Sequence, residues 1–100
     1  MVWNRVRVLA MKSKNKKSMT ALERHHVERV KMLGCSVCDD PRQCEAHEIK
    51  QGSWFLSIAL CPSCHRDAKL GIHGEKLMWR IKKMDELDAL NITLQRLEQR

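Results

Sequence analysis

The sequence predicts a small α+β domain, with a β-hairpin and the helix that follows it at the centre and further helices on both sides. Two observations predict this fold class. A short strand-like segment at 44–50 is followed by a turn at 51–53 and by a second segment at 54–60 that is rich in aromatic and branched residues, an order typical of a β-hairpin. Apolar residues at helical spacing, preceded by helix-capping patterns, lie before and after that segment. We therefore expect one domain at residues 20–100, preceded by a flexible basic arm at residues 1–19.

Local capping and turn signals place the individual elements. Thr20 and Glu23 form a capping box, and Gly34 is a typical residue just after a helix end. Pro62 suits the first turn of a helix, where its missing N–H is not needed, and Asp85 is a typical N-cap. In chain order, the predicted elements are a helix at 21–33, strands at 44–50 and 54–60, and helices at 62–70, 75–83 and 86–98.

Four of the five cysteines form two Cys-x-x-Cys pairs, Cys35 with Cys38 and Cys61 with Cys64. Two such pairs can place four thiolates at the corners of a tetrahedron, the closed geometry of structural zinc. Thiolates select Zn²⁺ over magnesium or calcium, and small domains often use an added link of this kind. We expect this ion to be structural, because four protein ligands leave no open position. Cys44 is predicted to be a small buried residue, with a role as alternative ligand left open.

A second group of potential ligands lies in and after the predicted hairpin. His47 and Glu48 are on the first strand, His65 directly follows the second cysteine pair, and His73 lies between two glycines. The order strand, turn, strand, helix should bring His47 and His65 to the same spot. Imidazole and carboxylate groups suit a divalent cation that keeps some of its water. The alternative is structural: a hydrogen bond from His65 to the zinc cysteines, a buried His47, and His73 at a helix end.

These motifs together resemble the four-cysteine branch of the HNH (ββα-metal) nucleases, and most closely the phage recombination-enhancement, Ref-like nucleases. The resemblance covers about residues 35–74. It is carried by Cys35 and Cys38 and by the stretches EAHEI (45–49), LCPSCH (60–65) and GIHG (71–74). It implies an HNH-like core and a metal-dependent DNA endonuclease of phage or prophage origin, which acts in recombination or repair.

The resemblance also implies roles for the second group of residues. His47 and His65 would bind a catalytic Mg²⁺ or Mn²⁺, and His73 would be a further ligand or a phosphate contact. Glu48 departs from the family, which commonly has His-His-Ile where this chain has His47, Glu48 and Ile49. Glutamate is a weaker base than histidine at neutral pH, and alternation along a strand puts Glu48 opposite His47 unless a bulge intervenes. Three outcomes stay open: Glu48 is the general base, His73 is the base, or the site binds metal without turnover.

The distribution of charge favours a polyanionic partner. The formal net charge is +7, and residues 1–17 hold six basic and no acidic residues. Binding of such an arm to DNA would release condensed counterions, although a solvated tail is an equally ordinary explanation. The residues that we expect to contact DNA phosphates are Lys12, Lys14, Lys16, Lys17, Arg66, Lys69, Arg80, Lys82 and Lys83.

Composition also bears on the compartment. No stretch approaches the roughly 18–20 apolar residues needed to span a membrane, and no secretory signal is recognisable. Five cysteines in a reducing compartment favour metal binding over disulfides. We therefore expect a cytoplasmic protein, in a bacterial host cell if the resemblance holds.

Three alternatives concern activity and assembly. A non-catalytic zinc module that binds nucleic acid would show the same cysteine pairs and the same basic charge. A nuclease that needs a recombinase filament to present its substrate would show no cleavage on its own. The last predicted helix carries four leucines spaced three, four and three residues apart, which favour packing on the domain itself, with a homodimer as the alternative; they are Leu87, Leu90, Leu94 and Leu97.

Overall fold

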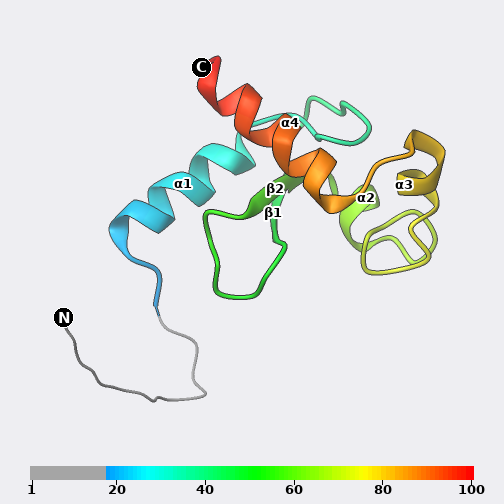
Figure 1. The fold of residues 1–100 in the computed structure, drawn as a ribbon, viewed down its shortest axis with the longest axis horizontal. Coiled ribbons are helices and arrows are strands. Elements are labelled where there is room, and N and C mark those ends of the chain that lie inside the picture. Colours follow the sequence, from blue (N-terminus) through cyan, green and yellow to red (C-terminus); the bar gives the residue numbers. More distant parts are fainter. Residues whose placement is uncertain (1–17) are drawn as a thin grey trace.

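The computed structural model describes residues 18–100, which form two short antiparallel strands and four helices (Figure 1). The elements are α1 (Ala21–Lys31), β1 (Glu45–Glu48), β2 (Ser57–Leu60), α2 (Pro62–Arg66), α3 (Leu77–Lys82) and α4 (Glu86–Glu98). This is the small α+β fold that the sequence predicts. Most of the predicted basic arm lies outside the described residues. Within residues 18–100, none of the helices has the length and the apolar character needed to cross a bilayer.

Helices α1 and α4 begin where the sequence places them, because local hydrogen bonds fix their first turns. The Thr20 hydroxyl accepts from the Glu23 N–H at 3.1 Å, and the Glu23 carboxylate accepts from the Thr20 N–H at 2.8 Å. Asp85 and Asp88 form the same reciprocal box at the start of α4. The end of α1 differs from the prediction, since the helix stops at Lys31 rather than at residue 33.

The buried face of α1 is confined to the later turns of the helix. Val27 and Val30 are buried, but the Leu22 side chain is 68% exposed. Figure 1 shows the reason: the N-terminal end of α1 extends away from the strands, so its first turn has no core to face.

The hairpin is shorter than predicted, and its loop is longer. Glu45 pairs with Leu60 and His47 pairs with Ile58, so the strands span only four residues each. Residues 54–56, predicted as strand, belong to the loop instead. The cause is a local turn in which the Leu56 N–H donates to the Ser53 carbonyl at 2.9 Å and the Ser57 hydroxyl donates to the Trp54 carbonyl at 2.6 Å.

Helix α4 packs on strand β2, whose four residues are all buried. A fully buried Thr93 joins the two elements: its hydroxyl accepts from the Ala59 N–H at 3.2 Å and donates to the Ala89 carbonyl at 3.0 Å. Leu90 and Leu97 lie in the same core, whereas two other leucines of the predicted series are exposed, Leu87 and Leu94. Only half of that series therefore packs on the domain itself.

Helix α2 ends at Arg66 instead of continuing to residue 70, as predicted. Asp67 adopts an extended backbone, and its carboxylate accepts from the N–H groups of Lys69 and Leu70, both at 2.9 Å. The chain then folds back on α2: the Ile72 N–H donates to the Cys64 carbonyl at 2.9 Å, and the His73 N–H to the His65 carbonyl at 3.2 Å. Helix α3 follows at Leu77–Lys82, shorter than the predicted 75–83, because the flanking residues at 76 and 83 have left-handed backbones.

Gly74 allows the close return of this loop, so Gly74→Ala is expected to destabilise the domain by about 2 kcal/mol. A Cβ at position 74 would collide with the backbone carbonyl of Ala68, and backbone atoms cannot rotate away as a side chain can. The measurement is chemical denaturation of the zinc-loaded protein. Ser63→Ala, an exposed site on α2, is the control and should stay within about 0.5 kcal/mol of wild type. Equal stability of the Gly74→Ala protein would show that the loop is not packed in this way.

Candidate metal centres

The four paired cysteines meet at one point in the structure. The sulfur atoms of Cys35, Cys38, Cys61 and Cys64 all lie within 4.8 Å of one another, with 3.6 Å between the Sγ atoms of Cys38 and Cys61. Sulfurs around one tetrahedral zinc ion lie roughly 3.8 Å apart, so the spacing fits. The N–H groups of Val37 and Cys64 donate to Cys35 Sγ and Cys61 Sγ, each at 3.4 Å. The cluster could therefore hold a metal such as zinc, as the sequence predicts.

Burial shapes the chemistry of these thiols. It raises the pKa of Cys38 to about 11 and also raises the pKa of Cys64. Backbone N–H groups act against burial at Cys35 and lower its pKa. A metal ion would have to displace protons from Cys38 and Cys64 as it binds. The donor set is all sulfur and largely buried, which fits a closed structural centre.

Cys44 is a separate case. It is buried in the core outside the cluster, and its thiol donates to the Arg42 carbonyl at 3.4 Å. Burial raises its pKa to about 12. This agrees with the predicted role of a small buried residue rather than with that of an alternative ligand.

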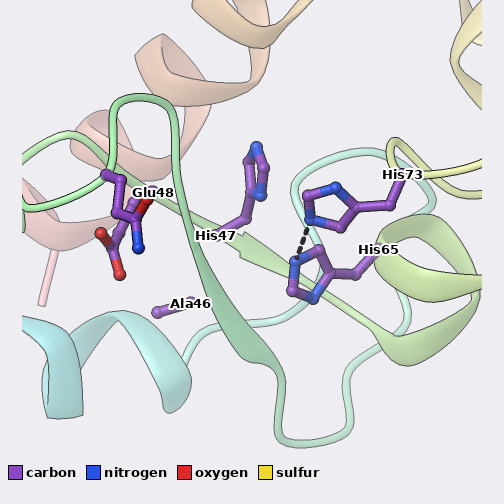
Figure 2. A pocket seen from close by; sticks show the side chains of 6 residues that line it. Ala46, His47, Glu48, His65 and His73 are labelled. Atoms are coloured by element: carbon purple, nitrogen blue, oxygen red, sulfur yellow. Dashed lines mark hydrogen bonds between the residues drawn. The ribbon is translucent and has the colours of Figure 1, made fainter.

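Three histidines form a second cluster, which draws on three parts of the chain. His47 comes from β1, His65 from α2, and His73 from the loop before α3. One ring nitrogen of each lies within 4.8 Å of the others, and the Nε2 atoms of His65 and His73 are 3.1 Å apart. Figure 2 shows the three side chains gathered beside the strand that carries His47. The structure thus brings together the three histidines that the sequence singles out.

The hydrogen bonds of His65 indicate what its ring can offer. Its Nδ1 lies 2.8 Å from Glu45 Oε1, and Glu45 is held by Arg66 through two further bonds of 2.9 and 2.6 Å. The Arg66 guanidinium lowers the pKa of Glu45, which favours the carboxylate, an acceptor only. In a neutral His65 ring, Nδ1 therefore carries the proton and Nε2 presents a lone pair toward His73. Nitrogens that share one tetrahedral zinc ion lie roughly 3.3 Å apart, so a divalent cation fits this pair.

The cluster lines a cavity of about 320 Å³ that is bordered also by Ala46, Glu48 and Gln51. Its histidines range from buried His47, through half-buried His65, to exposed His73. An ion at this place would therefore keep coordination positions open to solvent. That property distinguishes it from the cysteine centre.

Comparison with known proteins adds no relative to this description. No family model, curated protein or solved structure matches this chain. The likeness to HNH nucleases therefore depends on the sequence motifs alone, and the activity must be inferred from the two clusters.

Glu48 borders the cavity but does not join the histidines. Its carboxylate accepts from the Gly52 N–H at 2.7 Å, and Figure 2 shows it turned away from the three rings. This follows from the alternation of side chains along β1, which the sequence analysis anticipated. Of the four predicted catalytic residues, the three histidines lie together and Glu48 points away from them.

Glu86 is a neighbour of the cluster that sequence reasoning missed. Its Oε2 lies 2.6 Å from Nε2 of His47, although 39 positions separate the two residues. In the sequence it looks like an ordinary acidic residue in the first turn of a helix. Only the packing of α4 on the hairpin brings it to the site. Glu45 was easier than Glu86 to predict as a neighbour of the histidines, because the alternation of side chains along a strand puts Glu45 on the same face as His47.

The predicted phosphate contacts divide into three groups. Lys12, Lys14, Lys16 and Lys17 lie outside the described residues. Arg66 is already paired with Glu45, although its side chain remains 63% exposed. The others are exposed on α3 and the segments beside it: Lys69, Arg80, Lys82 and Lys83.

Proposed function

We propose that the protein is a metal-dependent endonuclease that hydrolyses phosphodiester bonds in DNA, with an HNH-like ββα-metal core. The observation that carries the proposal is the meeting of His47, His65 and His73 beside a cavity that is open to solvent. Strand, helix and loop each contribute one imidazole beside strand β1. A metal ion in the cysteine cluster would tie the loop after α1, which holds Cys35 and Cys38, to the start of α2.

The two clusters would have different tasks. The cysteine centre, with four buried or half-buried sulfurs, would hold structural Zn²⁺. A divalent cation held by the three histidines would polarise a phosphate and stabilise the charge on the leaving 3′-oxygen. Three imidazoles are softer ligands than Mg²⁺ prefers, so Zn²⁺ and Ni²⁺ are candidates beside the Mg²⁺ or Mn²⁺ that the resemblance implies.

Residues around the cavity would bind and orient the nucleic acid. Arg66 gives two N–H groups to Glu45 and keeps others for a phosphate. The exposed lysines and arginines on and beside α3 would hold the DNA backbone, contacts that position a strand and carry little sequence information. Glu48 borders the same cavity, so its carboxylate is a candidate acceptor for the proton of an attacking water.

A non-catalytic zinc module that binds nucleic acid is the second candidate. One observation favours it: the position that resembles a general base holds Glu48, and this carboxylate is engaged by the loop of the hairpin. Such a module would bind DNA with an affinity that falls steeply with salt, and would leave the DNA intact.

The test is DNA cleavage by purified, zinc-loaded protein on single-stranded and supercoiled DNA. Mg²⁺, Mn²⁺, Ni²⁺ and Zn²⁺ are added separately, and the assay is repeated with a recombinase filament on the single strand. Cutting that depends on the added cation is the expected result. DNA binding without cutting under all of these conditions would identify the protein as a binding module.

A further inference from the structure

Glu86 is the carboxylate that reaches the histidine cluster from outside the hairpin and α2. We propose that Glu86 is a positioning residue, which fixes the imidazole of His47 so that Nδ1 faces the other two histidines. The proposal rests on the metal site of the proposed function. It extends that site to helix α4, which lies outside the segment that resembles HNH nucleases.

The contact between the two side chains is short and sheltered. Glu86 Oε2 lies 2.6 Å from His47 Nε2, and the His47 side chain is only 8% exposed. Within residues 18–100, His47 is the one basic group within 4.0 Å of the Glu86 carboxylate. Glu45 differs in this respect, because Arg66 shares it with His65. The Glu86 carboxylate is therefore directed at a single ring.

The chemistry of the pair determines the tautomer of His47. A carboxylate only accepts hydrogen bonds, so Nε2 of His47 must be the donor. A neutral imidazole then has its one lone pair on Nδ1, and Nδ1 becomes the atom that can bind a metal. Carboxylates in this role orient ligand imidazoles and make them more basic. The rings of His65 and His73 stand at 67° and 70° to that of His47, with centroids 5.1 and 4.9 Å away.

Helix α4 is built to hold Glu86 in place. Glu86 is its first residue, where the positive end of the helix dipole favours a negative charge. The box of Asp85 and Asp88 fixes the first turn, and buried Thr93 and Leu90 anchor the helix against the core. The backbone of Glu86 is therefore held next to His47, and its half-buried side chain reaches the ring from there.

A plain ion pair that only fastens α4 to the hairpin is the alternative, and the two roles predict different results. Removing a fastening would lower stability alone. Removing a positioning residue would also leave His47 free to adopt either tautomer, which would weaken metal binding at the histidines.

The experiment compares Glu86→Ala and Glu86→Gln with wild type, each carrying one equivalent of Zn²⁺ on the cysteines. Co²⁺ is then titrated as a visible probe of the histidine cluster. Glu86→Ala is expected to bind Co²⁺ about 10- to 100-fold more weakly, the usual effect of losing such a carboxylate. Glu86→Gln should lose less, because its amide oxygen still accepts from Nε2. Glu98→Ala, at the exposed other end of α4, is the matched control and should bind Co²⁺ as wild type does.

A second readout needs no added cobalt. ¹⁵N NMR of the histidine rings should show His47 with its proton on Nε2 in wild type and in Glu86→Gln, and a mixture of tautomers in Glu86→Ala. Unchanged cobalt affinity together with an unchanged tautomer in Glu86→Ala would overturn the proposal. If Glu86→Ala does not fold, Glu86→Met takes its place, because it keeps the length of the side chain without an oxygen acceptor; wild-type cobalt affinity and an unchanged tautomer in that variant would overturn the proposal.

These results separate the two proposals. A wild-type protein that takes up no Co²⁺ beyond the cysteine centre would refute the histidine metal site itself. Co²⁺ binding that depends on Glu86, in a protein that cuts no DNA, would refute the nuclease and leave the positioning role standing.

Discussion

Replacing Cys64 with serine is expected to unfold the domain. Cys64 is fully buried, and a serine hydroxyl does not replace a thiolate on zinc. Structural zinc contributes about 10–16 kcal/mol in small zinc peptides, whereas whole domains are stable by about 5–15 kcal/mol. Loss of the ion should therefore exceed the stability of so small a domain. The measurements are zinc content and thermal unfolding followed by circular dichroism, in which Cys64→Ser should show no cooperative transition.

Cys44→Ala is the matched control for this prediction. Cys44 is buried in the same core, but its sulfur lies outside the cluster. This variant should keep one zinc ion and a cooperative transition, with a loss of about 1 kcal/mol. A Cys64→Ser protein that melts as wild type does would show that the cysteine cluster is not what holds the domain together.

The parts of the fold that could be predicted are those that neighbouring residues determine. The boxes of Thr20 with Glu23 and Asp85 with Asp88 act across three residues, so the starts of α1 and α4 are readable from the sequence. The predicted strands are too long, and the reason is again local. Residues 54–56 have high strand propensity, but a turn closed by Ser53 and neighbouring groups takes them out of the ladder.

The parts of the candidate site that could be predicted are those whose residues lie close together in the sequence. Each Cys-x-x-Cys pair spans four residues, so the sequence points directly to a cysteine cluster. The convergence of His47, His65 and His73 depends on the return of the loop after α2, and only the order of elements suggested it. Glu86 depends on how α4 lies across the hairpin. A single acidic residue at a helix start contains no information about that packing.

His65→Ala is expected to lower DNA cleavage about a thousandfold or more if the protein is the proposed nuclease. The variant would remove one imidazole from the cation and would leave Glu45 paired with Arg66 alone. Lewis-acid stabilisation by a metal supplies several kcal/mol, and each 1.4 kcal/mol corresponds to a tenfold change in rate. Cleavage of supercoiled DNA, with the cation that best activates wild type, gives the measurement.

The value of this variant is that the fold and the structural zinc should survive it. Alanine is the best helix former, the His65 N–H bond to the Cys61 carbonyl in α2 is made by the backbone, and the cysteine sulfurs are untouched. His25→Ala, exposed on α1, provides the control and should cut as wild type does. Wild-type cleavage by a folded, zinc-loaded His65→Ala protein would remove the histidine cluster from the chemistry. A graded loss, larger in His65→Ala than in Glu86→Ala, is what a ligand and its positioning residue should produce, because one removes a bond to the metal and the other only loosens a ring.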